Sequence, residues 1–570
     1  MTIRTRVATG LVFAISALLT APAQEPRAGE PPPPYRPAKD AKDLRAVLFN
    51  WTWYMGMLRG IDEHELITSL EYQGKGSIQV DGQPCTLTKY RVSTNYEVPG
   101  QRVQYTCTRP NGQTVSNIEV VHGPYAWNED TPGAEIVPGK GKAMPMPAAV
   151  QERLVRIWAS PQGAPKAAIF GAAPNEELGA NPGTLLKDGV MKAGETSLAW
   201  QNGRPVVTFP IPGVAGAVAT ATLNDKYMVE HVVVKQGSTT TEFTYGDYQD
   251  WNNPLNKIEA FYAGKIDERK NGTLVSDLTT TQTETGSVYV VMPVPASVQA
   301  AIHATPFAMP KFRNAELTAS AQTPRMPNGH PDMTGNWNYN AMNWRYGFRR
   351  CGPTQEEGCT RAINQTMDFE FEAPSRFGPS RPIYKPENWD KVQQLDMWTN
   401  KDDPVMTCQP LGIPREGPPR RIVQSANDII FFYTQYVDGG GGQGEYRIIP
   451  TDGRKHDEKK AIESFYMGYT VGKWEGDTLV LDSISFVDST WLARGGFFHS
   501  DQMHVIEKLT RKGNQILYEV TVEDPEVLAE PWVMTPRVLT LTSNPEAGLL
   551  PERGNCEVYE TKDISSQIRH

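Results

Sequence analysis

The sequence predicts a mainly β protein, with a curved half-barrel and packed helices in its N-terminal half and an eight-stranded antiparallel barrel in its C-terminal half. Apolar and polar residues alternate with period two through much of the chain, as in strands that bury one face. Tight-turn pairs separate several of these runs, for example Asp81-Gly82 and Asn111-Gly112. The 570 residues include 49 glycines and 46 prolines, which favours many turns over long helices.

The first β-rich domain is expected over residues 40–290 and includes two helices. Apolar residues at spacings of three and four predict a helix over 41–58, with Leu44, Leu48 and Trp51 on one stripe. A second helix is expected over 148–158. The other runs predict strands at 69–80, 87–98, 101–108, 115–121, 204–211, 217–223, 228–234, 240–245, 257–266 and 273–283.

A Pro- and Ala-rich stretch over 291–331 predicts a linker, and the second domain is expected over 332–562. The first part of this domain is irregular and Pro-rich up to about residue 421, with one helix predicted at 386–400. Eight strand-like runs follow, at 428–437, 445–449, 468–474, 478–486, 503–510, 515–523, 537–542 and 556–560. Eight hairpin-linked strands are enough to close a small barrel, which is either filled by side chains or holds one small ligand.

The first 23 residues have the pattern of a cleavable signal peptide. Arg4 and Arg6 precede an apolar run over 7–19, and an A-x-A cleavage site follows at 21–23. The apolar run is shorter than a typical transmembrane helix, and no later apolar stretch is long enough to span a membrane. The sequence therefore predicts a periplasmic or secreted protein without a transmembrane segment after cleavage.

Six cysteines in an oxidising compartment predict disulfides rather than a metal site, because they are scattered and form no C-x2-C pair. Six cysteines allow 15 pairings. Local spacing favours a bond between neighbouring strands, a second across a short loop, and a third joining the start and end of the last domain. These pairs are Cys85–Cys107, Cys351–Cys359 and Cys408–Cys556.

Composition and motifs exclude several classes of function. The formal net charge is −9, which is opposite to the basic excess of a nucleic-acid-binding protein. No phosphate-binding loop, G-x-S-x-G elbow or H-E-x-x-H motif occurs, and no G-x-G-x-x-G follows a strand in a βαβ unit. The four glycines at 439–442 lie between two apparent antiparallel strands and are interpreted as a hairpin loop. The sequence therefore predicts no cofactor, no metal and no nucleic-acid partner.

Two regions are similar to known families. Residues 40–285 carry SLEYQGKG (69–76), GPYAW (123–127) and ERLVRIW (152–158). This region resembles the half-barrel of periplasmic lipoprotein carriers (LolA/LolB-like), and more closely a related domain that precedes exported metallo-β-lactamase-fold hydrolases. The resemblance implies a curved sheet around a hydrophobic groove.

The second half resembles a bacterial family of exported proteins of unknown function. The matching segments include GHPDMTGNW (329–337), CQPLGIPR (408–415) and GKWEGDTLVL (472–481). A lipocalin-like barrel is the expected architecture. The zinc chemistry of the hydrolases is not implied for this chain, because no two of its nine histidines are separated by one residue.

A polar cluster at 497–507 supplies candidate acid–base residues: His499, Asp501, His504 and Glu507. Histidine titrates near neutral pH, and a neighbouring carboxylate can orient it. His504 and Glu507 are three positions apart, so on a regular strand they point to opposite faces. The alternative roles are capping of the turn or metal binding.

Aromatic side chains and one arginine in the last domain are candidates to line a ligand site. They are Trp337, Arg447, Tyr469, Trp474, Trp491 and Trp532. Aromatic residues on strands are also common in ordinary cores. Arg447 alternates with Ile448, so it could point into a polar lumen.

The leading functional hypothesis is an exported binding or carrier protein for a hydrophobic or aromatic small molecule. The first alternative is a hydrolase or lyase that acts on such a molecule in the C-terminal barrel, using the histidines and carboxylates. The second is a purely structural envelope protein in which both sheets are filled by side chains.

Overall fold

The computed structural model describes residues 40–57, 67, 69–96, 99–172, 195–251, 261–285, 288–304, 317–338, 381–395, 402–433, 445–493, 496–534 and 536–544. The predicted signal peptide, Cys351, Cys359, Cys556 and the predicted strand at 556–560 lie outside these residues. Residues 37–570 form one compact unit. The prediction of a mainly β protein is confirmed. No described helix is long and apolar enough to cross a membrane.

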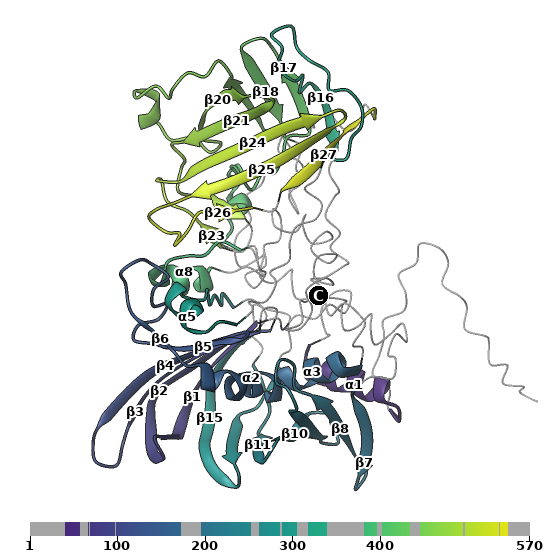
Figure 1. The fold of residues 1–570 in the computed structure, drawn as a ribbon, viewed down its shortest axis with the longest axis vertical. Coiled ribbons are helices and arrows are strands. Elements are labelled where there is room, and N and C mark those ends of the chain that lie inside the picture. The colour runs from purple at the N-terminus through teal and green to yellow at the C-terminus, as the bar shows by residue number, and fades with distance from the viewer. Residues whose placement is uncertain are drawn as a thin grey trace, which may run out of the picture. The chain divides into compact units, whose positions relative to one another are not determined.

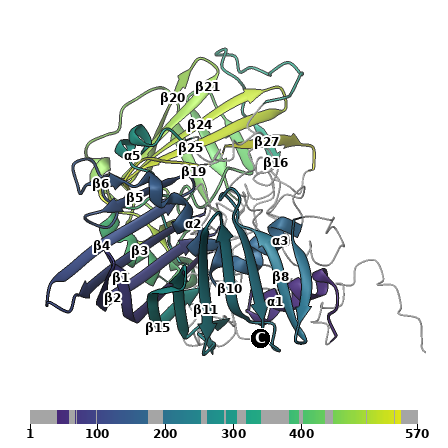
Figure 2. The same cartoon turned by 60° about the horizontal axis from the view of Figure 1, so that its bottom comes forward.

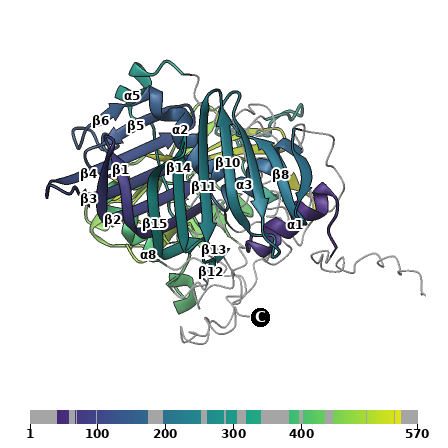
Figure 3. The same cartoon turned by 90° about the horizontal axis from the view of Figure 1, so that it is seen from below.

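Thirteen antiparallel strands form the N-terminal sheet, in the order β6-β5-β4-β3-β2-β1-β15-β14-β11-β10-β9-β8-β7 (Figure 3). The predicted run at 69–80 is strand β1. The strands are β1 (Ser69–Val80), β2 (Gln83–Asn95), β3 (Gly100–Thr108), β4 (Thr114–His122), β5 (Tyr125–Glu129), β6 (Ala143–Pro145), β7 (Ser197–Gln201), β8 (Arg204–Pro210), β9 (Val218–Leu223), β10 (Val229–Gln236), β11 (Thr239–Gly246), β14 (Lys265–Lys270) and β15 (Thr273–Thr285). A two-stranded sheet pairs β12 (Gln249–Asp250) with β13 (Phe261–Tyr262).

Three helices lie along one side of this sheet (Figure 1). They are α1 (Leu44–Tyr54), α2 (Val150–Ala159) and α3 (Gly163–Ala172). Helix α1 begins after Asp43, whose side chain accepts a hydrogen bond from the Ala46 amide at 2.9 Å. The helices predicted at 41–58 and 148–158 are confirmed with shifted ends. Helix α3 was not predicted, because its Gly- and Ala-rich sequence is buried almost all round and has no single apolar stripe.

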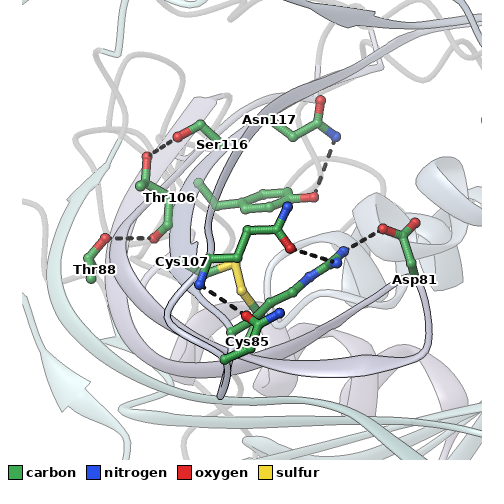
Figure 4. The surroundings of a disulfide bond; sticks show 11 residues. Asp81, Cys85, Thr88, Thr106, Cys107, Ser116 and Asn117 are labelled. Carbon is green, nitrogen blue, oxygen red and sulfur yellow. Dashed lines mark hydrogen bonds and ion pairs between the residues drawn. A yellow bond between two sulfur atoms is a disulfide. The ribbon is translucent and has the colours of Figure 1, made fainter.

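The disulfide predicted between Cys85 and Cys107 is present and joins the neighbouring strands β2 and β3 (Figure 4). The Thr88 hydroxyl donates to the Thr106 carbonyl across the same two strands at 3.0 Å. Cys408 is also disulfide-bonded. Its partner is not one of the other described cysteines, so the predicted Cys408–Cys556 bond stays a prediction.

The C-terminal region is a nearly closed antiparallel barrel of ten described strands, in the order β19-β18-β17-β16-β27-β25-β24-β21-β20 with β26 beside β25 (Figure 1). The strands are β16 (Gly335–Asn338), β17 (Arg421–Gln424), β18 (Asp428–Phe432), β19 (Tyr446–Pro450), β20 (Tyr469–Glu475), β21 (Thr478–Ile484), β24 (His504–Lys512), β25 (Gln515–Glu523), β26 (Trp532–Val533) and β27 (Arg537–Thr542). A separate pair joins β22 (Trp491–Ala493) and β23 (Phe497–Phe498).

Two features bring the ends of this meander together. Strand β16 pairs with β27, so the first strand of the barrel lies beside the last described one. The edge strands β19 and β20 contact each other, and the Gly453 amide donates to the Gly472 carbonyl at 3.1 Å. The predicted count of eight strands was incorrect for the described residues. Strands β16 and β17 are short; β16 lies in the stretch that was predicted to be irregular, and β17 begins where that stretch ends.

The stretch at 288–302 packs against the N-terminal sheet, although its second part was predicted to belong to a linker. Val290, Met292 and Val298 belong to the same apolar cluster as Trp127 of β5. Helix α5 (Ala296–Ala301) contacts β5 and β6 (Figure 2). The helix predicted at 386–400 is shorter, since a 3-10 turn at Pro386–Asn388 leads into α8 (Trp389–Gln394) and residues 396–401 lie outside the described part.

Candidate functional site

A charged pair lies inside the apolar interior of the C-terminal barrel. Arg447 of β19 contacts Glu507 of β24 through two hydrogen bonds, from Nη1 to Oε2 at 2.7 Å and from Nη2 to Oε1 at 2.8 Å. Arg447 is 5% exposed and Glu507 is fully buried. Two parallel bonds of this kind fix the arginine plane relative to the carboxylate.

Strand alternation explains why these charges point inward. On β19, Arg447 and Ile449 are buried, whereas Tyr446 and Ile448 are 61% and 62% exposed. On β24, Glu507 lies between the buried Val505 and Leu509 on the same face. Arg447 therefore points into the barrel, as its alternation with Ile448 allowed.

Hydroxyl groups from three further strands and from the end of β18 surround the pair. The Tyr433 hydroxyl accepts from Arg447 Nε at 2.8 Å and Nη2 at 2.5 Å. The Tyr518 hydroxyl donates to Glu507 Oε1 at 2.7 Å. Thr470 Oγ1 lies 3.4 Å from Arg447 Nη1 and 2.8 Å from Ser483 Oγ.

Burial and the ion pair control the protonation of this group. Burial raises the pKa of Tyr433 and of Tyr518 above the usual range, so both tyrosines keep their protons. Burial lowers the pKa of Arg447, but the Glu507 carboxylate together with Tyr433 and Tyr518 outweighs this effect, and the net shift is upward. Arg447 is therefore charged at neutral pH, and both tyrosines are neutral.

The Tyr433 hydroxyl has one unused hydrogen-bonding function. A tyrosine oxygen accepts through its lone pairs and donates through its single hydrogen. Arg447 uses the oxygen as acceptor twice. Among the residues that the structure describes, no acceptor takes the Tyr433 hydrogen. A ligand oxygen in the barrel could accept it.

His504 lies on the opposite face of β24, as its spacing from Glu507 predicted. Its Nδ1 lies 3.1 Å from Glu523 Oε2, and its Nε2 lies 3.0 Å from Asp482 Oδ1. The hydrogen bond to Asp482 raises the pKa of the imidazole, aided by Glu523 and opposed by partial burial. His504 therefore belongs to an outer carboxylate–histidine group and not to the interior pair.

His499 and Asp501 occupy two further environments. His499 is 3% exposed, with Nε2 2.7 Å from the Thr490 hydroxyl and Nδ1 2.9 Å from the Ser500 carbonyl oxygen. Burial lowers its pKa. Asp501 is exposed and accepts from the Gln502 amide at 2.9 Å. The structure thus does not gather the four candidate acid–base residues around one point.

Four of the five predicted aromatic residues belong to or pack against the core cluster of this region, and Tyr469 lies on the other face of β20. Trp337, Trp491 and Trp532 are buried in the core cluster of this region. Trp474 stacks on the His330 ring with centroids 4.6 Å apart, and Tyr469 contacts the His456 ring at 5.0 Å.

Sequence reasoning missed the hydroxyl residues around Arg447, namely Tyr433, Thr470, Ser483 and Tyr518. The alternation of inward and outward side chains along a strand is the signal that could have identified them. Tyr518 lies on β25 between the inward positions of Ile516 and Val520, so a polar group there had to meet a partner inside the barrel.

Among the described residues, no group of three or more His, Cys, Asp or Glu side chains could hold a metal ion. No protein-family model matches the chain, and no curated protein is significantly similar to it. The chemistry of the barrel interior is therefore the main guide to function.

Proposed function

We propose that the protein is an exported binding protein that holds a hydrophobic or aromatic small molecule in its C-terminal barrel. The interior is lined largely by apolar side chains, and Arg447, Glu507 and Tyr433 supply one localised polar group. This combination is typical of small-molecule sites, in which apolar walls give affinity and a few polar atoms fix orientation.

The enclosed ion pair is the observation that carries the proposal. A buried ion pair is often no more stabilising than apolar residues of the same volume, so packing alone gives little reason to keep one. In this proposal the ion pair serves ligand binding. Arg447 holds the Tyr433 hydroxyl oxygen in place, and the Tyr433 hydroxyl hydrogen is then available to a ligand. The expected ligand has an oxygen acceptor on an otherwise apolar or aromatic body.

Native mass spectrometry of the full chain purified from its own cells tests this function. We expect a co-purifying small molecule, and a roughly tenfold loss of its affinity in Tyr433→Phe, which removes one hydrogen bond. Tyr469→Phe is the matched control, because its ring packs against His456 away from the interior pair. No bound molecule, or equal binding by both variants, would contradict the proposal and favour a structural role.

The enzyme alternative has weaker support. A hydrolase or lyase needs its acid, base and reacting atoms within hydrogen-bond reach of one substrate position. His504 and Glu507 face opposite sides of β24, and His499 contacts Thr490 and Ser500 instead of either. The proposal therefore assigns Glu507 to ligand positioning through Arg447 and Tyr433.

A further inference from the structure

A second group of polar and aromatic side chains lies between the N-terminal sheet and helix α2. We call Tyr72, Tyr90, Tyr96 and Tyr262 the tyrosine cluster. The Tyr72 ring centroid lies 6.1 Å from that of Tyr90 and 5.1 Å from that of Tyr262. Tyr96 extends the cluster to α2, since its ring centroid lies 6.4 Å from that of Trp158.

Two buried atoms, one in the last turn of α2 and one in the link between α2 and α3, have no hydrogen-bond partner among the described residues. They are Nε1 of Trp158 and Oε1 of Gln162. Trp158 is 2% exposed and Gln162 is fully buried. Buried polar atoms are almost always paired in folded proteins, and an unpaired one is costly. A donor and an acceptor left open only four positions apart therefore need an explanation.

A third unpaired atom lies on the same face of the sheet. Thr283 is buried and its hydroxyl has no partner among the described residues. It is directly opposite Tyr72 in the pairing of β1 with β15, and residues opposite each other in an antiparallel pair share a face. The open hydroxyl thus lies beside the tyrosine cluster.

Other polar groups near the tyrosine cluster already have hydrogen-bond partners, so only a few groups stay open for a ligand. The Gln162 amide nitrogen donates to the Phe261 carbonyl at 2.7 Å, and the Tyr245 hydroxyl donates to the Ala159 carbonyl at 2.8 Å. Arg156 pairs with Glu268 at 3.2 Å and with Glu152 at 3.1 Å. The three open groups are one N–H donor, one amide acceptor and one hydroxyl, beside aromatic rings. The buried Lys166 ammonium also faces the tyrosine cluster, with Nζ 4.9 Å from the Tyr96 ring centroid.

We propose that this region is a second ligand site, separate from the barrel, and that it binds an aromatic molecule carrying a hydroxyl group. The hydroxyl oxygen accepts from Trp158 Nε1, and the single hydroxyl hydrogen donates to either Gln162 Oε1 or Thr283 Oγ1. The aromatic body packs against the tyrosine rings, which favour offset or edge contacts with another ring.

Binding of 2-naphthol and of naphthalene to the full chain tests the site, since the two probes differ by one hydroxyl group. By isothermal titration we expect 2-naphthol to bind at least about tenfold more tightly, as expected for hydrogen bonds to otherwise unpaired groups. Trp158→Phe and Gln162→Met should each remove most of this preference. Trp200→Phe is the control, because Trp200 is 45% exposed on edge strand β7.

The preference between the two probes is a ratio, so it stays readable even if a variant changes the affinity for both. Equal affinities in the wild-type chain, or an unchanged ratio in both Trp158→Phe and Gln162→Met, would overturn the second site. Crystals soaked in 2-naphthol that show only ordered water at Trp158 and Gln162 would do the same. If Tyr433→Phe changes the ratio and Trp158→Phe and Gln162→Met do not, the probes bind in the barrel. That result would overturn the second site and support the proposed function.

Discussion

Replacing Glu507 by glutamine leaves the Arg447 guanidinium charged inside the barrel without its counter-ion. The two side chains are 4% and 0% exposed, so water cannot take over the role of the carboxylate. Breaking a buried pair by removing one partner typically costs 3–5 kcal/mol. We therefore expect Glu507→Gln to lower the free energy of unfolding of the barrel by about 3–5 kcal/mol.

The double variant Arg447→Met/Glu507→Leu separates the charge from the packing. It removes both charges and keeps the volume roughly similar, so the cost of an unpaired buried charge disappears. The Tyr433 and Tyr518 hydroxyls then lose their partners, at about 1–3 kcal/mol each before relaxation. We expect the double variant to be more stable than Glu507→Gln.

Hydrogen exchange of peptides from β19 and β24 measures the opening of the barrel separately from the N-terminal sheet. The exposed pair Arg204–Glu230 is the matched control, with a distance of 2.6 Å and side chains 49% and 38% exposed. Glu230→Gln should cost less than about 1 kcal/mol, as surface ion pairs do. A similar small cost for Glu507→Gln would refute the electrostatic reasoning.

Two further predictions concern single side chains. The folded-state pKa of His504 lies above its usual 6.5, so this histidine stabilises the fold at pH below that value and its contribution is lost as pH rises through the folded-state pKa. An imidazole NMR titration midpoint at or below 6.5, or one that Asp482→Asn does not lower, would contradict this. Thr283→Val removes an unpaired hydroxyl and should leave the free energy of unfolding nearly unchanged in urea titrations. Thr280→Val breaks the 2.7 Å bond from its hydroxyl to the Ala263 carbonyl and should cost about 1–3 kcal/mol, so equal costs for the two variants would be unexpected.

Local patterns predicted most of the strands and two of the helices. The run at 69–80 became β1 without a change of bounds, and the run at 515–523 became β25. Both have clear period-two alternation, and this periodicity depends only on the geometry of an extended backbone. Short strands such as β16 were missed, because four residues are too few to show a period of two. Strand β16 is stabilised by its pairing with β17 and β27, which are distant in sequence.

The candidate site was predicted in pieces. Arg447 and Glu507 were both candidates, but in separate roles, as a ligand-binding and a catalytic residue. Their sequence separation of 60 residues gave no indication that they form two hydrogen bonds. His504 was placed correctly on the face opposite Glu507, whereas the sequence did not indicate which of the two faces was inside.

The sequence by itself determined the β class, the two faces of each long strand and the bond between Cys85 and Cys107. These features depend on side-chain alternation and on strands joined by short turns. Only the tertiary structure decided that Arg447, Glu507, Tyr433 and Tyr518 meet, because they lie on strands that are brought together when the first and last described strands of the barrel pair. Alternation divides a strand into two faces, and closure of the sheet determines which face becomes the interior.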